Sequence, residues 1–287
     1  MRTLSDSMRA KVFLIIGILV LAQADTLLLH AGEPGQQFQG FNLQGYKDDG
    51  EKAWVVNGDK ADIAGSEIRI SNVDAESYDE EKVNLTAQTG IIDQTSGNMH
   101  LEKDVVITSE RGTQLVTDSL DWNRNKDVVK TKDPVVITDE GLKLTGTGME
   151  AKPGLKTAQI HEDVTVTMDT DPKPEATKTV TITCDGPMVI DQARSLATFE
   201  QNVVAVQDDQ TLKADRMEIY FDEEKKEVRK MICTGHVVIV RGENKSFADT
   251  AVYDSVDKKM TLTGRPKLVL MTEGKNAITA FGDPESR

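Results

Sequence analysis

Residues 212–239 read LKADRMEIYFDEEKKEVRKMICTGHVVI, and the structure of this stretch decides the fold. The centre, DEEKKE at 222–227, places opposite charges near the spacing that stabilises helices. However, Met217, Ile219 and Phe221 alternate with polar neighbours, which is the period of a β-strand. The stretch is therefore either one charged helix or two strands joined by a charged turn.

Related sequences elsewhere in the chain resolve this choice. Six similar units begin at Leu85, Leu115, Leu144, Ile182, Leu212 and Phe247. Each has an alternating strand, a polar turn, a second strand, and then Gly, Asn or Asp before a valine-rich run. The turns DQTSG, NRNKD and DSVDKK occupy the place of DEEKKE, and they carry typical turn residues. Residues 212–239 are thus predicted to form a β-hairpin.

The repeat predicts an all-β protein. A unit of a few strands cannot bury its apolar face alone, so neighbouring units must stack into one continuous sandwich or solenoid. The starts of the units lie 30, 29, 38, 30 and 35 residues apart. The longest spacing contains DPKPE at 171–175, which we expect to be a boundary between two halves or a long loop.

The first residues predict export from the cytoplasm. Arg2, Arg9 and Lys11 precede an apolar run at 12–22, and Ala22-Gln23-Ala24 resembles a signal-peptidase site. The run is shorter than the roughly 20 residues of a membrane span, so a signal peptide at 1–24 is favoured over a retained membrane anchor. Residues 25–37 then form a linker, and the mature chain has a net charge of −14 − 2 = −16.

Composition excludes several classes of function. The charge and the absence of a basic cluster argue against nucleic-acid binding. The four histidines do not have metal-ligand spacing, and the chain lacks the common catalytic motifs, so no metal, cofactor or enzymatic activity is expected. Cys184 and Cys233 are equally compatible with a disulfide and with two buried thiols.

The alternation of apolar residues predicts which side chains point inward. Their default role is core packing, but a sandwich with splayed sheets would leave an apolar groove suited to acyl chains. The groove candidates are Leu85, Leu101, Ile107, Trp122, Ile137, Leu144, Ile182, Phe199, Leu212, Met217, Ile219, Phe221, Ile239, Phe247, Tyr253 and Leu262.

Two segments resemble lipopolysaccharide-export proteins of Gram-negative envelopes. Residues 38–81, with Gly-Tyr-x-x-x-Gly before Trp54, then GDKAD at 58–62 and SNVDAESY at 71–78, resemble the periplasmic domain of LptC. The units beginning at Leu212 and Phe247 resemble the repeat of LptA and related OstA-type domains. The chain thus looks like an LptC-like half at 38–170 joined to an LptA-like half at 171–287.

The resemblance implies a β-jellyroll of two splayed antiparallel sheets, either extended or as two stacked jellyrolls. It also implies a periplasmic, non-enzymatic carrier that holds lipid A acyl chains in its groove. The implied partners are the inner-membrane ABC transporter components and like jellyroll proteins, which would dock by adding strands at the sheet edges. LptC-type proteins usually keep an inner-membrane anchor, so anchoring of this chain stays open.

Two other functions are compatible with a repetitive β protein. An exported β-solenoid with a structural or adhesive role would have regular coils, whereas the spacings here are unequal. A polysaccharide-active enzyme would need charged residues facing one another in a cleft, whereas the alternation places apolar residues there.

Overall fold

The computed structural model describes residues 36–47, 49–78, 82–152, 156–169, 179–222 and 227–271. The predicted signal peptide, most of the linker, the DPKPE segment and the centre of the DEEKKE turn lie outside these residues. The described chain consists of seventeen β-strands and one 3-10 turn at Arg124–Lys126. This confirms the all-β prediction. No helix in the described part is long and apolar enough to cross a membrane.

The strands are longer than the sequence units suggest. Their bounds are β1 Gln36–Tyr46, β2 Lys52–Ala64, β3 Glu67–Tyr78, β4 Lys82–Asp93, β5 Met99–Ser109, β6 Gln114–Asn123, β7 Val128–Asp139, β8 Leu142–Lys152, β9 Thr157–Asp169, β10 Thr179–Cys184, β11 Met188–Asp191, β12 Leu196–Gln207, β13 Gln210–Asp222, β14 Glu227–Arg241, β15 Asn244–Asp254, β16 Lys259–Thr263 and β17 Lys267–Val269.

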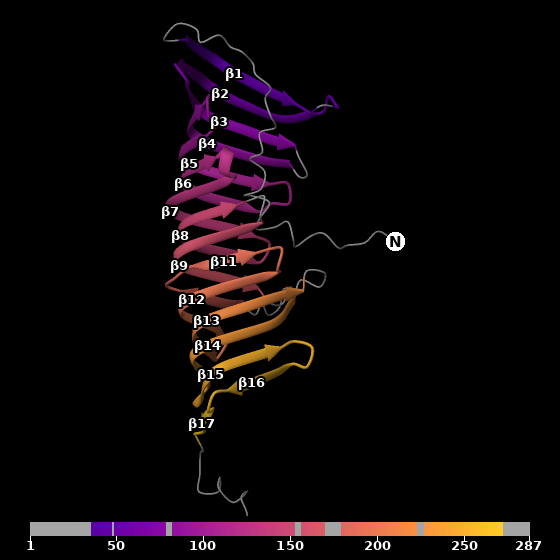
Figure 1. Cartoon of the computed structure of the whole chain (residues 1–287), viewed down its shortest axis with the longest axis vertical. Coiled ribbons are helices and arrows are strands. Elements are labelled where there is room, and N and C mark those ends of the chain that lie inside the picture. Colours follow the sequence, from indigo (N-terminus) through magenta and orange to yellow (C-terminus); the bar gives the residue numbers. More distant parts are fainter. Residues whose placement is uncertain are drawn as a thin grey trace, which may run out of the picture.

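Successive strands pair antiparallel along the whole chain and form one sheet (Figure 1). β10 and β11 lie end to end between β9 and β12, and β16 and β17 both pair with β15. The opening stretch forms β13 and β14, which pair from Gln210↔Arg241 to Asp222↔Glu227. The hairpin prediction is therefore correct. Because β9 pairs with β10 and β11, the fold is one extended jellyroll without a break in the sheet.

Five of the six repeats contain a bend inside their second strand. In β5, β7, β9, β12 and β14 the register shifts because these strands carry one residue more than their partners at the bend. Several residues there have positive φ, among them Lys103, Asp104, Gln201 and Asn202. Such β-bulges bend a strand sharply. In these five units the Gly, Asn or Asp before the valine-rich run is therefore a bend in one continuous strand, whereas in the sixth unit Gly264 lies between β16 and β17.

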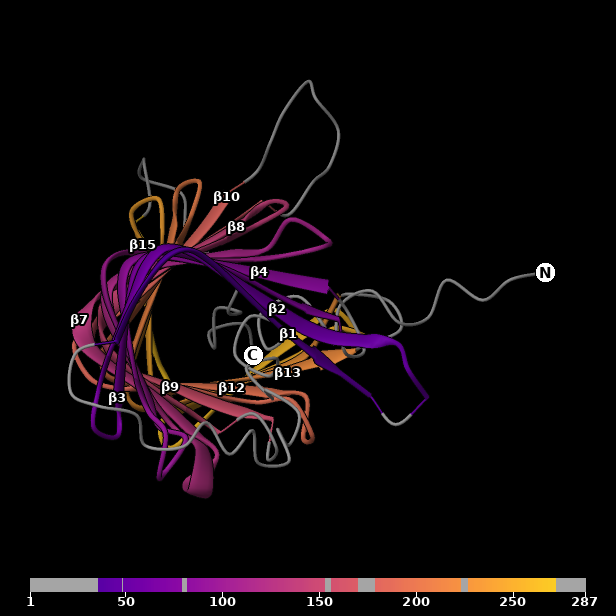
Figure 2. The ribbon, with the colours of Figure 1, turned by 90° about the horizontal axis from the view of Figure 1, so that it is seen from above.

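The aligned bends fold the sheet into an arch with two facing arms (Figure 2). We call this line of bends the corner. Arm 1 contains the strand segments with Leu85, Ile107, Leu144 and Leu212, and arm 2 contains those with Leu101, Trp122, Phe199 and Met217. Across the corner, side chains of neighbouring strands form hydrogen bonds, such as Asn72 to Asp59, Gln88 to Asp104 and Asn202 to Asp185, each at 2.6 Å.

In the strands without a bulge, the inward positions change parity at the corner. In β13, Leu212 and Ala214 are buried before the bend, and Met217 and Ile219 are buried after it. In β13, even-numbered residues thus point inward on arm 1 and odd-numbered residues on arm 2. A single alternating pattern cannot describe a strand of this kind, whereas the extra residue of a bulged strand keeps its inward parity unchanged.

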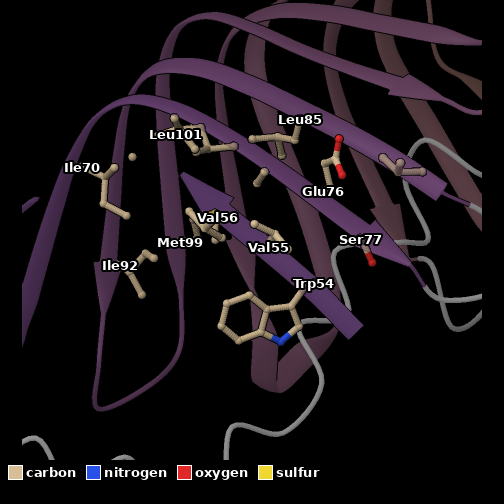
Figure 3. A pocket seen from close by; sticks show the side chains of 14 residues that line it. Trp54, Val55, Val56, Ile70, Glu76, Ser77, Leu85, Ile92, Met99 and Leu101 are labelled. Carbon is tan, nitrogen blue, oxygen red and sulfur yellow. The ribbon is translucent and has the colours of Figure 1, made fainter. Parts of the chain in front are cut away.

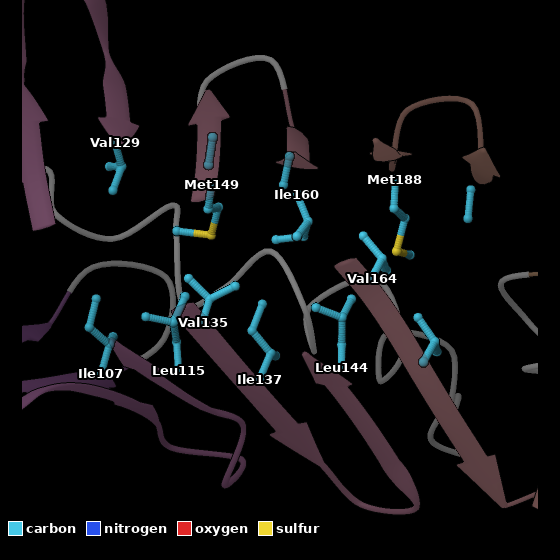
Figure 4. Packing of buried hydrophobic residues seen from close by; sticks show 14 of the residues in the cluster. Ile107, Leu115, Val129, Val135, Ile137, Leu144, Met149, Ile160, Val164 and Met188 are labelled. Atoms are coloured by element: carbon cyan, nitrogen blue, oxygen red, sulfur yellow. The ribbon is translucent and has the colours of Figure 1, made fainter. Parts of the chain in front are cut away.

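The core fills the space between the arms along the length of the molecule. Figure 4 shows Ile107, Leu115, Ile137 and Leu144 of arm 1 opposite Val129, Met149, Ile160 and Met188 of arm 2. Because the large apolar side chains lie on the inner face of the sheet, the two arms must bury them against each other.

Both cysteines are buried free thiols within this core. Burial raises the pKa of Cys184 to about 11 and that of Cys233 to about 12. Cys184 lies in β10 and Cys233 in β14, and three strand spacings of about 4.8 Å each separate these strands. The resulting distance of about 14 Å exceeds the Cα–Cα distance of roughly 7 Å that a disulfide can bridge. Of the two interpretations left open by the sequence, the structure supports two small buried side chains.

Candidate functional site

The predicted groove residues line the inside of the arch. Eleven of them are at most 8% exposed: Leu85, Leu101, Ile107, Trp122, Ile137, Leu144, Ile182, Phe199, Leu212, Met217 and Ile219. Phe221, Ile239 and Leu262 are partly buried and pack against the same core, and Tyr253 is half-buried. These side chains fill the interior, so most of the predicted groove is packed core.

Phe247 does not belong to this set, and its prediction as an inward residue is wrong. It pairs with Val238, which in turn pairs with Lys213 on the outer face of arm 1, and it is 37% exposed. Phe247 has the same parity as the buried Ala251 but lies on the other side of the corner. The change of inward parity at the corner explains the error.

An apolar cavity of about 40 Å³ lies between the arms at the N-terminal end (Figure 3). Arm 1 contributes Trp54, Val56 and Leu85, and arm 2 contributes Ile70, Ile92 and others. Ligand pockets usually measure 300–1,000 Å³. The cavity therefore admits little more than a methyl or methylene group as it stands, and a longer apolar ligand requires the arms to separate.

The composition of the cavity favours a hydrocarbon ligand. Among the residues that line it, Glu76 is the one charged side chain, and Ser77 Oγ is buried without a hydrogen-bond partner. The indole of Trp54 lies against Gly45 of β1, where any side chain would overlap the ring. Trp54 thus packs between the cavity and the first strand of the sheet, and the cavity lies close to that edge.

The cavity residues before Leu85 were missed by the sequence analysis. Trp54, Val56, Ile70 and Val73 lie in β2 and β3, and these strands precede the first recognised repeat. The run AWVV at 53–56 is apolar without alternation, and all four residues are buried, so the period of a strand could not show which of them point into the cavity.

Both ends of the sheet expose apolar side chains. β1 pairs only with β2 among the described strands, and its Phe38 and Tyr46 are 43% and 58% exposed. At the other end, Leu268 of β17 is 62% exposed and pairs with Ser246, which pairs with the inward Ile239. Among the described residues, the interior of the arch is thus uncovered at its last strand, and no further strand pairs with the outer side of β1 or of β16 and β17.

The outside of arm 2 carries the main titratable cluster. Nδ1 of His100 lies 2.6 Å from Oδ1 of Asp121, and its Nε2 lies 3.0 Å from Oε1 of Glu102. Burial opposes protonation of His100, but the two carboxylates outweigh it and raise the pKa of the imidazole. No three histidine, cysteine, aspartate or glutamate side chains of the described residues are arranged to hold a metal ion.

We expect His100 to stabilise the fold at low pH. A histidine with a raised pKa contributes stability fully below its unfolded-state pKa of about 6.5. That contribution disappears as the pH rises through the higher folded-state pKa. Urea unfolding should therefore show His100→Gln to be less stable than the wild type at pH 5.5 and nearly equal to it at pH 8.5. The reverse pH dependence would contradict this assignment.

A matched control is His236→Gln. His236 also contacts a carboxylate, with Nδ1 2.8 Å from Oδ2 of Asp215, but its side chain is 91% exposed. Exposed ion pairs contribute little because solvent screens them. The pH dependence of this variant should therefore be much weaker.

Two family models match consecutive parts of the chain. Residues 12–169 match the model described as "Lipopolysaccharide-assembly, LptC-related". Residues 181–281 match the model described as "LptA/(LptD N-terminal domain) LPS transport protein". A search of curated proteins found no match. The first match covers more than half of the 287 residues.

Proposed function

The chain belongs to the LptC-related lipopolysaccharide-assembly family, and from this premise we propose that the apolar interior of its arch carries the acyl chains of lipid A across the periplasm. Both matched families concern lipopolysaccharide transport, so a role in that process is established at this level. The observation that supports the acyl-chain site is the apolar cavity between the two arms at the N-terminal end.

The energetics favour binding through hydrocarbon. Each buried methylene contributes about 0.8 kcal/mol, so a few methylenes can offset the partial separation of the arms. The phosphates of lipid A are anionic, and a chain with a net charge of −14 repels them. In the proposed complex the acyl chains therefore enter between the arms, and the headgroup stays in solvent.

The two ends of the sheet are the proposed docking sites. In this arrangement one edge, β1 or β16–β17, faces the inner-membrane ABC transporter components, and the other pairs with the next jellyroll protein. The exposed Phe38 and Leu268 support it because strand addition would cover them. The protein would act without catalysis in the periplasm, either soluble after cleavage of residues 1–24 or anchored to the inner membrane. The proposed halves are an LptC-like half at 38–170 and an LptA-like half at 171–287.

Photo-crosslinking at two adjacent residues tests the acyl-chain site. Ile92 lines the cavity, whereas Ile91 pairs with Arg69 and His100 on the outer face of arm 2. A photoreactive amino acid at 92 should form a lipopolysaccharide adduct in Gram-negative cells, and the same amino acid at 91 should not. Because both side chains are half-buried in β4, they perturb the fold to a similar extent.

Two outcomes would overturn the proposed site. One is equal crosslinking from positions 91 and 92, which would indicate a surface contact. The other is the absence of lipid both from the adducts and from the protein purified from a Gram-negative host, measured by mass spectrometry.

A further inference from the structure

The outer faces of the two arms differ sharply in charge. On arm 1, two rows of outward side chains run in register from β5 to β14, and we call them the neutral face. They are Val106, Thr108, Gln114, Val116, Val136, Thr138, Lys143, Thr145, Thr165, Thr167, Thr181, Thr183, Val204, Val206, Thr211, Lys213, Val238 and Val240. These eighteen residues include seven valines and eight threonines but no carboxylate, although the chain has 48 Asp and Glu.

The outer face of arm 2 over the same strands is charged. Its outward rows are His100, Glu102, Ser119, Asp121, Lys130, Glu150, Gln159, Val189, Thr198, Glu200, Arg216, Glu218, Ile232 and Thr234. Five of these fourteen residues are carboxylates. Many are paired, as in Lys130 with Glu150 at 2.7 Å and Arg216 with Glu200 at 2.6 Å. The preference of strands for Val and Thr acts on both arms, so it does not explain the difference.

We propose that the neutral face is a self-association surface on which a second copy of this chain packs back to back. Two copies with a net charge of −14 repel each other wherever carboxylates meet. The neutral face lets them approach without such contacts. Flat rows of Val and Thr also suit face-to-face packing of two sheets, which places them about 10 Å apart.

Charge complementarity supports a second copy as the occupant. The two charged residues of the neutral face, Lys143 and Lys213, are both cationic. The hairpin ends at the rim of arm 1 are acidic, with Asp139 at the end of β7, Glu140 directly after it, and Asp208 and Asp209 between β12 and β13. A two-fold related copy would bring its lysines toward the rim of its partner, so the same surface supplies both halves of the contact.

The size of the surface predicts a weak dimer. Nine strands at about 4.8 Å spacing and four residues at about 3.3 Å cover roughly 500 Å² per copy. The total of about 1,000 Å² lies at the lower limit for a specific interface, so we expect a dissociation constant in the micromolar range. Because both sheets twist, the copies should be closest at the centre of the face, near β9 and β10.

Sedimentation equilibrium of the full chain tests this proposal with two matched variants. Thr165 and Thr183 pair across β9 and β10 on the neutral face, whereas Gln159 and Val189 pair across β9 and β11 on the charged face. The double variant Thr165→Glu/Thr183→Glu should raise the dimer dissociation constant at least about tenfold, because like charges then face each other across the interface. Gln159→Glu/Val189→Glu should leave it unchanged.

The form of association separates this dimer from docking at the sheet ends. A back-to-back pair is closed and stops at two copies, whereas end-to-end pairing continues to higher masses. A wild-type chain that stays monomeric up to about 200 µM, far above the expected range, would overturn the proposal. An open series of masses, or an equal effect of both double variants, would also overturn it. The result is independent of lipid crosslinking at Ile92, so the two proposals fail separately.

Discussion

Replacing Phe199 by alanine should lower the free energy of unfolding by about 3–5 kcal/mol, the usual range for a buried phenylalanine. Phe199 is 1% exposed in β12 and lies between Met188 of β11 and Met217 of β13 on the inner face of arm 2. Its removal would leave a cavity that these neighbours cannot fill, because their backbones are fixed by the sheet. Urea unfolding followed by circular dichroism measures the loss.

The matched control is Val206→Ala in the same strand. Val206 is 40% exposed on the outer face of arm 1, so truncation removes little buried surface. The expected change is within about 0.5 kcal/mol, apart from the small strand preference of valine. Comparable losses for both variants would show that the interior of arm 2 is not tightly packed.

The tight packing around Phe199 bears on where lipid can bind in the proposed transport function. An interior packed by residues such as Phe199 and Met217 cannot hold acyl chains along its whole length without disrupting the core. Lipid should therefore enter where packing is already incomplete, at the cavity beside Trp54 and Ile92. For this reason the proposed site is tested at Ile92 and not at a fully buried residue.

The fold class could be predicted from the sequence because each of the six repeat units can be compared with the five others. DEEKKE alone resembles a helix, but its counterparts contain turn residues, and β13 and β14 pair as that comparison requires. The inward residues were also largely predictable because one side of each strand must be apolar to form a core. Fourteen of the sixteen predicted residues lie in that core or pack against it.

The sequence did not predict the corner. Each of the five bulges contains a Gly, Asn or Asp, which are also the residues of turns, so local chemistry could not distinguish a bend from a strand end. Phe247 was misplaced because the parity of inward residues changes at this corner. The cavity was missed because it is enclosed by side chains of β2 to β5, which are distant from one another in the sequence and meet only when the two arms face each other.

Gly235 lies at the corner in β14, and Gly235→Ala should cause the second large loss in the free energy of unfolding. Gly235 has φ of +78° in the bulge, and a Cβ there would overlap the carboxylate of Asp215 in β13. A left-handed non-glycine residue costs about 1–2 kcal/mol, and displacing the Asp215 side chain from its rotamer adds about 0.5–1.5 kcal/mol. We expect a loss of about 2–3 kcal/mol in urea unfolding.

Gly242→Ala separates the two causes of that loss. Gly242 lies in the turn between β14 and β15 with φ of +57°, but nothing lies within 4 Å of the position of its Cβ. Its replacement should cost only the conformational part, about 1–2 kcal/mol. If Gly235→Ala costs no more than Gly242→Ala, Asp215 does not press against the bulge. The loss in Gly235→Ala would then be conformational only, and the packing of Asp215 against Gly235 would not contribute to the stability of the bend.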